Sequence, residues 1–313
     1  LFIAAVFGIL WIVYIKPFYL DAFSLRLKSH YQCEFVLNRL TATDILFAGG
    51  CGVLCCLCLY YYAKKPGHRT IDRLLFLVGL AFVLLAAWRY VTKTYIFDGD
   101  WFTTYHFDAY FYPVYKVYSG QTPLIDFKNL YGFYPYFLAP ILALMGGATM
   151  YHFSLITAAL VAACFLSIFF SMTLLLKNRL ISTLCTIAVI SWMVEFPDTF
   201  QGVYYLQYVP QRLLFPSIFL LLCSLQLTAK KQTREKWLKG ITFLIVSLSL
   251  LWNPDTGVVI AIAYPAFLIY RALTTRDLKD KNLYRIAGAA FTGTLASVVG
   301  ALLILLLITF ART

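Results

Sequence analysis

The residues most able to do chemistry in this sequence are acids that stand at the ends of long apolar runs. A charged group beside hydrocarbon is costly, so acids that converge on one membrane face suggest a functional site. Carboxylates there could hold a divalent cation, although no fixed ligand spacing argues for one. Ordinary solvation of loops is the alternative explanation. The acids that fall on one side of the predicted membrane are Asp98, Asp100, Asp108, Asp126, Glu195, Asp198 and Asp255.

The composition identifies the elements that must position these acids as membrane-spanning helices. The chain is 61% hydrophobic and only 13% charged, and a water-soluble domain of this length cannot hide that much apolar surface. Apolar runs long enough to cross hydrocarbon, roughly 17–25 residues each, recur along the sequence. Each run must be helical, because an unsatisfied backbone amide in lipid costs several kcal/mol. We therefore predict an all-α, polytopic transmembrane helical bundle.

The apolar runs predict about nine spans. These spans cover residues 1–15, 45–63, 74–91, 151–176, 180–196, 212–229, 240–253, 256–271 and 286–310. A further apolar stretch, residues 132–149, is broken by Pro135, Pro140 and the pair Gly146-Gly147.

The basic loops decide whether residues 132–149 cross the membrane. These loops lie at residues 64–73, 177–179, 230–239 and 271–285, and the positive-inside rule places such loops in the cytoplasm. All of them fall on one side only if residues 132–149 do not cross. We therefore predict that this stretch lies at the outer interface or dips into it. Residues 16–42 are also basic although they would lie outside, so the orientation of the first span stays open.

Neither the net charge nor the cysteines indicate a different class of protein. The formal charge of +12 does not predict a nucleic-acid partner, because the basic residues occupy short loops between apolar runs. The eight cysteines lie mostly inside apolar runs, where cysteine behaves as a small hydrophobe. The cluster Cys55-Cys56-x-Cys58 has no hydrophilic ligands nearby, so we expect neither a disulfide scaffold nor a metal site there.

The long outer loop contains an amphipathic helix that we predict over residues 104–118. Its apolar residues follow helical spacing and form one face, while Asp108, Tyr112 and Lys116 fall on another. Thr103 or Thr104 can cap its start, and Ser119-Gly120 can end it. We expect such a helix to lie in the headgroup region with its apolar face toward the membrane. That face consists of Phe107, Tyr110, Phe111, Val114 and Val117.

A series of short motifs runs through this loop in a fixed order. The motifs are His106-Phe107-Asp108-Ala109, Gly120-Gln121-Thr122-Pro123, Ile125-Asp126-Phe127, Tyr131-Gly132, Phe137-Leu138-Ala139-Pro140 and Met145-Gly146-Gly147. Together they resemble the first outer loop of the GT-C superfamily of membrane glycosyltransferases. The resemblance is narrower to the polyprenyl-phosphate-sugar transferases of the protein O-mannosyltransferase and aminoarabinose-transferase branch. Later stretches at residues 212–216 and 251–257 are similar to outer-edge stretches of the same branch.

The chain also departs from the pattern of that family. The family often has an Asp-Glu pair where this chain has Asp108-Ala109, and Tyr-Gly-Pro where it has Tyr131-Gly132-Phe133. The sizeable C-terminal outer domain of many relatives is absent from these residues. We predict an N-terminal transmembrane hairpin over residues 1–73 and a GT-C-like transmembrane module over residues 74–313, with its outer loop at 92–150. The departures affect the identity of the acceptor more than the class of reaction.

The resemblance implies an inverting glycosyltransferase of the bacterial inner (cell) membrane that acts at the extracytoplasmic face. Such an enzyme moves a hexose or a pentose from a polyprenyl-phosphate carrier to an acceptor, which can be a glycan, a lipid or a protein. Its other partners are the membrane lipids, with no nucleic acid. The resemblance fixes no cofactor, and a divalent cation stays open.

The resemblance also suggests a role for individual residues. A carboxylate must take the proton of the acceptor hydroxyl, and Asp108 is the first candidate, followed by Asp126. A cation must meet the leaving phosphate, and the Arg212 guanidinium can hold phosphate through two bonds. The other substrate-binding candidates are Lys116 and Lys128 for the phosphate, His106 for orientation, and Trp101, Tyr131 and Tyr134 for stacking on sugar.

Three other functions stay open. A transporter for lipid-linked glycans would favour acids and helix breaks near the middle of spans, whereas the acids here lie at span ends. A non-catalytic membrane subunit of a glycan-assembly complex would lose little activity when Asp108 is replaced by Asn. An O-antigen polymerase or ligase would also use an outer loop, but with more Arg and His in it.

Overall fold

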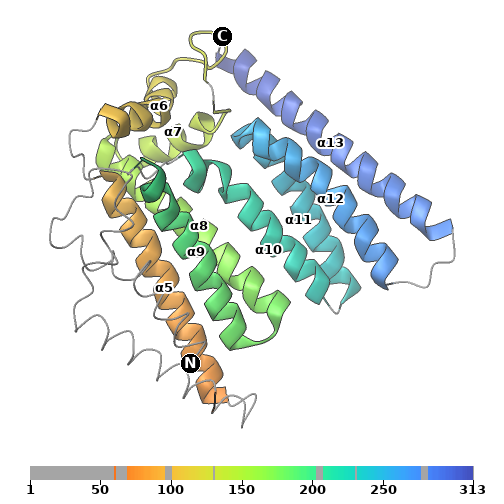
Figure 1. Cartoon of the computed structure of the whole chain (residues 1–313). Coiled ribbons are helices and arrows are strands. Elements are labelled where there is room, and N and C mark those ends of the chain that lie inside the picture. Colours follow the sequence, from red (N-terminus) through yellow and green to blue (C-terminus); the bar gives the residue numbers. More distant parts are fainter. Residues whose placement is uncertain are drawn as a thin grey trace, which may run out of the picture.

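The computed structural model of the chain is nearly all helical, and the residues that it describes contain no strand (Figure 1). This confirms the all-α class. The described residues are 60, 69–95, 101–129, 131–201, 207–229, 231–275 and 281–312. Most of the predicted hairpin at residues 1–73 lies outside them, as do the candidate acids Asp98 and Asp100.

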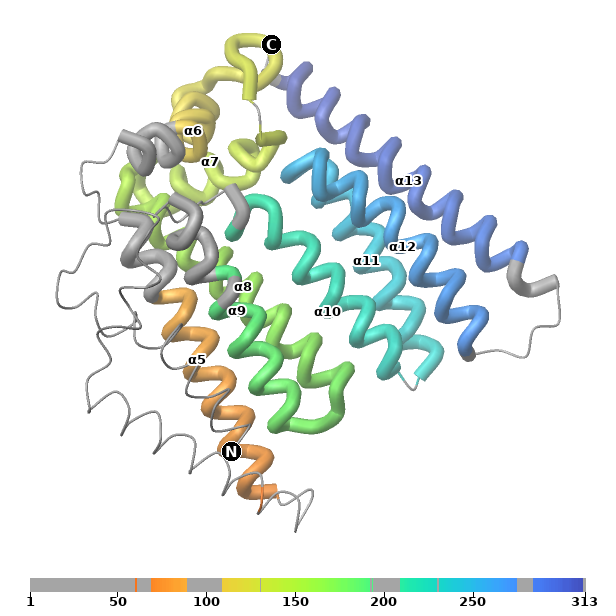
Figure 2. The backbone as a smooth tube through the Cα atoms, in the orientation of Figure 1, coloured from red at the N-terminus to blue at the C-terminus, as the bar shows by residue number. Residues whose placement is uncertain are grey.

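Most of the helices run side by side along the bundle, and two lie across one end of it (Figures 1 and 2). These two, α6 and α7, pack together in the loop between α5 and α8. In chain order the elements are α5 (Arg69–Tyr95), α6 (Trp101–Tyr118), α7 (Pro135–Leu144), α8 (Met150–Leu176), α9 (Arg179–Gln201), the π-helical turn η3 (Gln207–Arg212), α10 (Leu214–Thr228), α11 (Gln232–Trp252), α12 (Pro254–Thr275) and α13 (Lys281–Arg312).

Four of the described helices are long and apolar enough to cross a membrane. They are Arg69–Trp88, Met150–Leu176, Pro254–Thr274 and Tyr284–Ala311, which coincide with predicted spans. The prediction of about nine spans is not confirmed. Two further apolar stretches among the described residues are shorter, Arg179–Ser191 in α9 and Leu214–Thr228, which is α10. The spans predicted over residues 1–15 and 45–63 lie outside the described part of the chain.

Helix α7 is too short to cross a membrane. It has 10 residues and is therefore about 15 Å long, whereas the hydrocarbon core is about 30 Å thick. It begins with Pro135 and ends before Gly146 and Gly147, which both have positive φ. The prediction that residues 132–149 do not cross the membrane agrees with this length.

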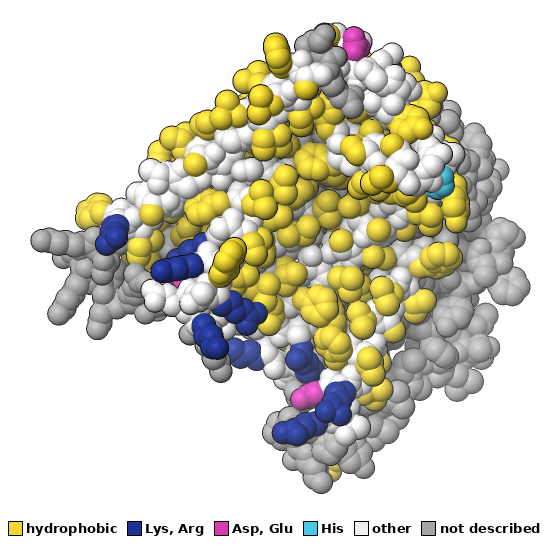
Figure 3. All heavy atoms as spheres, turned by 180° about the vertical axis from the view of Figure 1, so that it is seen from behind, with side chains coloured by type: hydrophobic (Ala, Val, Ile, Leu, Met, Phe, Trp, Pro, Cys, Tyr) yellow, Lys and Arg dark blue, Asp and Glu magenta, His cyan; other side chains and the backbone are white. Residues whose placement is uncertain are grey.

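The two ends of the bundle differ in charge. One end, called here the basic end, contains the starts of α5, α9 and α11 and the end of α12 (Figure 1). The opposite end, called here the loop end, contains α6, α7, η3 and the turn between α11 and α12. Lys and Arg side chains gather at the basic end, while apolar side chains cover the rest of the same face (Figure 3). The described residues that carry this charge are Arg69, Arg73, Lys177, Arg179, Lys231, Arg234, Lys236, Lys239, Arg271 and, near the start of α13, Arg285.

The core centres on α8, which packs against α5, α9 and α10. Its side chains Phe153, Val161 and Phe165 are fully buried. Cys164 and Cys223 are free and buried, as expected for cysteines that serve as small hydrophobes. Helices α11 and α12 approach very closely at Gly257, where a Cβ atom would lie 2.6 Å from the Leu250 backbone.

Candidate functional site

Helix α6 forms one wall of the loop end and ends as the sequence predicts. The N–H of Gln121 donates to Lys116 O (2.9 Å) and the N–H of Gly120 donates to Val117 O (3.1 Å). These two bonds are the Schellman arrangement, in which a left-handed residue follows the helix. Gly120 supplies that residue with φ of +92°. The helix begins at Trp101, one turn before the predicted start.

The apolar face of α6 packs on protein, so the prediction that it faces the membrane is wrong. Tyr110, Val114 and Val117 are buried. The Tyr110 ring stacks on Tyr134 with centroids 4.7 Å apart and meets Phe153 of α8 edge-on at 5.5 Å. The spacing correctly identifies an apolar face, but α8 and the start of α7 cover it in place of lipid.

Tyr134 is a structural residue, and the prediction that it stacks on a sugar is wrong. Its side chain is fully buried, and its hydroxyl donates to Tyr110 O at 2.7 Å. Burial raises the pKa of Tyr134 well above its ordinary value, and the neighbouring Tyr110 and Tyr131 add to the increase. A neutral, hydrogen-bonded phenol therefore joins α6 to the start of α7.

Asp126 closes a tight turn. Its Oδ2 accepts a hydrogen bond from the N–H of Thr122 at 2.6 Å, and the N–H of Asp126 donates to Thr122 O at 2.9 Å. Leu124, inside the turn, has a φ of +71°, which a non-glycine residue rarely adopts. Asp126 is itself exposed, so one carboxylate oxygen holds the turn at a solvent-facing position.

Lys116 connects α6 to this turn through aromatic rings. Its Nζ lies 4.6 Å from the centre of the Tyr112 ring and 4.9 Å from that of Phe127. Both distances suit the attraction between a cation and the face of an aromatic ring. Lys128, the next basic residue, is exposed in the loop.

Residues 129–133 join three parts of the chain that are far apart in sequence. The Asn129 side-chain amide donates to Gly132 O at 2.6 Å. The Gln211 side-chain amide donates to Tyr131 O at 2.7 Å, and the N–H of Phe133 donates to Leu251 O at 2.9 Å. We call this contact between the loop, η3 and the end of α11 the three-way junction.

Gly132 is required by the geometry of the three-way junction. Its φ of +94° lies in the region that favours glycine. A Cβ atom at this position would lie 2.5 Å from Trp252 O and 2.7 Å from Pro254 Cδ. The Tyr131-Gly132 motif therefore has a physical role, because only glycine lets the loop approach the turn between α11 and α12.

Trp252 is the central aromatic residue of the junction. It is 3% exposed, and its indole N–H donates to Gln211 O at 2.9 Å. Three rings surround it with centroid distances of 5.7 to 5.8 Å, from Tyr134, Phe137 and Phe215. The stretches at residues 212–216 and 251–257 therefore meet beside the loop that joins α5 to α8.

A charged pair lies beside this junction. Arg212 Nη2 is 4.0 Å from Asp255 Oδ2, and the side chains are 36% and 76% exposed. Asn253 fixes the position of Asp255 by capping α12, since its Oδ1 accepts from the N–H of Thr256 at 3.3 Å. The adjacent Gln211 is buried, and its Oε1 accepts no hydrogen bond in the described part of the structure.

The structure brings only some of the predicted site residues together. Tyr131, Arg212 and Asp255 meet around the three-way junction, whereas Lys116 lies beside the turn that Asp126 closes. For three predicted site residues of α6, the structure describes the helical backbone but not the side chains: Trp101, His106 and Asp108. The same holds for Glu195 and Asp198 of α9.

Sequence reasoning missed the roles of Gln211 and Trp252. Each is a polar-tipped side chain at the end of an apolar run. That position is the only sequence signal for a buried hydrogen-bonding role.

Among the described residues, no group of three or more His, Cys, Asp and Glu side chains could hold a metal ion. The sequence matches no protein-family model. Comparison with curated proteins and with solved structures likewise finds no match.

Proposed function

We propose that the chain is a membrane glycosyltransferase that moves a sugar from a polyprenyl-phosphate carrier to an acceptor at its loop end. The observation that carries the proposal is the placement of Arg212 and Asp255 beside the three-way junction. The junction joins the loop motif Tyr131-Gly132 to Gln211, which directly precedes the stretch 212–216, and to Leu251 in the stretch 251–257. These are the two later stretches that are similar to outer-edge stretches of the GT-C branch.

The reaction needs a base and a cation. The acceptor oxygen attacks the anomeric carbon, its proton passes to a carboxylate, and the bond from that carbon to the phosphate oxygen breaks. The phosphate leaves with the electron pair of that bond. In this proposal Asp108 takes the proton, with Asp126 as second choice, and Arg212 stabilises the charge that develops on the phosphate.

The surroundings of Arg212 suit this role. At 4.0 Å its contact with the exposed Asp255 is at the limit of an ion pair, so an arriving phosphate can compete for the guanidinium.

The distribution of charge supports glycosyl transfer over transport. In the described residues no Asp, Glu, Lys or Arg side chain is buried, whereas transporters place polar and charged groups near the middle of their spans. The basic end faces the cytoplasm under the positive-inside rule, which leaves the loop end extracytoplasmic, in a bacterial inner membrane if the family resemblance holds.

The test is transfer from radiolabelled polyprenyl-phosphate sugars by the full chain in liposomes. We expect Arg212→Gln to lower kcat/KM roughly ten- to a hundredfold, the value of a charge-assisted hydrogen bond. Arg234→Gln at the basic end removes the same charge and should leave kcat/KM unchanged. An unaltered kcat/KM in a folded Arg212→Gln protein would contradict the proposal, as would the absence of transfer from every such donor.

A further inference from the structure

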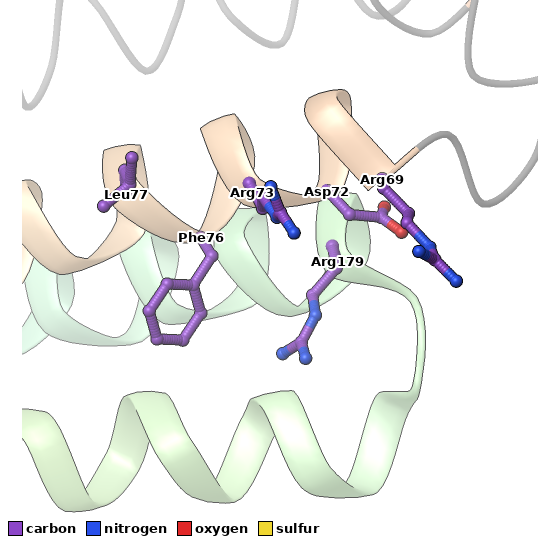
Figure 4. Close-up of a pocket in the computed structure, with 6 residues that line it drawn as sticks. All are labelled: Arg69, Asp72, Arg73, Phe76, Leu77 and Arg179. Carbon is purple, nitrogen blue, oxygen red and sulfur yellow. The ribbon is translucent and has the colours of Figure 1, made fainter.

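A pocket opens between α5 and α9 at the basic end, far from the site described above (Figure 4). Its volume is about 580 Å³. Arginine side chains from both helices reach into it, with an apolar wall one turn further along α5. The lining residues are Arg69, Asp72, Arg73, Phe76, Leu77 and Arg179.

The pocket is positively charged. Its arginines outnumber its single acid, Asp72. Within the described part of the chain, no ion pair within 4.0 Å joins Asp72 to any of these arginines. The three arginines and the one acid that line the pocket leave it a net charge of +2, and an anion is the ligand that such a pocket would attract.

One nitrogen of the Arg179 guanidinium, Nη1, is a buried hydrogen-bond donor without a partner among the described residues. The guanidinium carbon lies 5.6 Å from the centre of the Phe76 ring, which holds the group against the wall of the pocket. Leaving a buried charged donor unsatisfied is costly, and an anion in the pocket would satisfy it. Oδ1 of Asp72 in the same pocket is likewise buried without a hydrogen-bond partner among the described residues, and its charge would oppose that anion.

The position of the pocket identifies the kind of anion. Arg69 is the first residue of the candidate span Arg69–Trp88, and the ends of spans lie at the level of lipid headgroups. Next to the arginines, α5 exposes Leu74 (57%) and Leu77 (58%). Cationic groups beside exposed leucines match a phosphate headgroup followed by acyl chain.

We propose that this pocket binds the phosphate of an anionic membrane phospholipid, with the acyl chains lying along Leu74 and Leu77. Arg179 and Arg73 hold the phosphate, and the ring of Phe76 supports Arg179. This site is independent of glycosyl transfer, because it lies at the basic end between α5 and α9, whereas Arg212 lies beside Asp255 at the start of α12, at the loop end.

The test measures lipid binding by native mass spectrometry of the full chain, titrated with phosphatidylglycerol or phosphatidylcholine. We expect the wild type to bind phosphatidylglycerol more tightly than phosphatidylcholine. Arg179→Gln should weaken the affinity for phosphatidylglycerol roughly tenfold. Arg234→Gln, also at the basic end but outside the pocket, should bind as the wild type does. Asp72→Asn removes the only negative charge of the pocket and should tighten binding, a gain that misfolding cannot imitate.

Three results would overturn the assignment. The first is equal binding of the two lipids, and the second is an unchanged affinity for phosphatidylglycerol in both Arg179→Gln and Asp72→Asn. The third concerns the source of the phosphate: if inorganic phosphate displaces phosphatidylglycerol from the wild type as readily as added lipid does, the ligand is a soluble phosphate and not a lipid.

Discussion

Gly132 shows how one residue of a short motif can determine a contact between distant segments. Its positive φ and its close contact with the backbone of Trp252 are separate constraints, and both exclude any residue with a Cβ atom. Asp126 illustrates the opposite case, since its bond to the N–H of Thr122 is made within a few residues. A bond between residues four positions apart is within reach of sequence patterns, whereas no local pattern shows that residue 132 meets the backbone of Trp252.

We expect Gly132→Ala to destabilise the protein much more than Gly120→Ala. Both glycines have nearly the same φ, +94° and +92°, so each alanine adds strain of about 1–2 kcal/mol. A Cβ atom at 132 also meets Trp252 O and Pro254, whereas one at 120 meets nothing within 4 Å. Thermal unfolding in detergent compares the two, and equal losses of stability would contradict the close approach described for Gly132.

At the scale of elements, Glu235 joins α11 to α12 at the basic end. Its carboxylate oxygens lie 2.8 Å from Lys239 Nζ and 3.0 Å from Arg271 Nη2. Burial alone would raise the pKa of Glu235, but the hydrogen bonds and charges of Lys239 and Arg271 outweigh burial and lower it below its ordinary value of 4.5. The ionised form therefore stabilises the contact between the two helices.

This lowered pKa gives an expected pH dependence for Glu235→Gln. Because the folded pKa lies below the unfolded one, the stabilisation is fully present above pH 4.5 and is lost as the pH falls through the folded value. Wild type should therefore unfold at a higher temperature than Glu235→Gln at neutral pH, and the difference should shrink in acid. Unfolding temperatures measured across this range provide the check; a difference that does not change with pH would rule out the ion pairs as its cause.

The sequence predicts individual elements better than what covers them. Residues 104–118 have the spacing of an amphipathic helix, and Ser119-Gly120 marks its end, because both signals are local. Spacing alone cannot reveal whether lipid or protein covers the apolar face, and here the rings of Tyr134 and Phe153 cover it. In the same way, the hydrogen bond from the Gln211 side chain to Tyr131 O joins residues 80 positions apart. No local sequence pattern indicates such a bond.

At the scale of the whole molecule, the grouping of basic residues at one end follows from the sequence. The positive-inside rule requires that residues 132–149 do not cross, and α7 is indeed too short to do so. The number of spans is harder to predict, because an apolar helix that packs inside a protein need not cross the full thickness of a membrane. Helix α10 has 15 residues, fewer than the span predicted over residues 212–229, and it packs against α8.

The proposed orientation can be tested by labelling single cysteines at the two ends of the bundle. Lys128 is exposed at the loop end and Lys236 at the basic end, so each tolerates substitution without loss of packing. We expect a membrane-impermeant thiol reagent to label Lys128→Cys in intact cells and Lys236→Cys only after permeabilisation. Labelling of each variant is compared with the background labelling of the unsubstituted chain. The reverse pattern would place the loop end in the cytoplasm and contradict the proposed function.

The most direct test of the central claim is the turnover of polyprenyl-phosphate sugar by Asp108→Asn. Removing a general base should lower kcat by about 10²–10⁴-fold, with donor binding retained. Asp126→Asn distinguishes the first candidate base from the second. Its amide oxygen can still accept from the N–H of Thr122, so the turn is kept, and a kcat near that of wild type would leave Asp108 as the base. A folded Asp108→Asn protein that turns over donor at the wild-type rate would contradict the account.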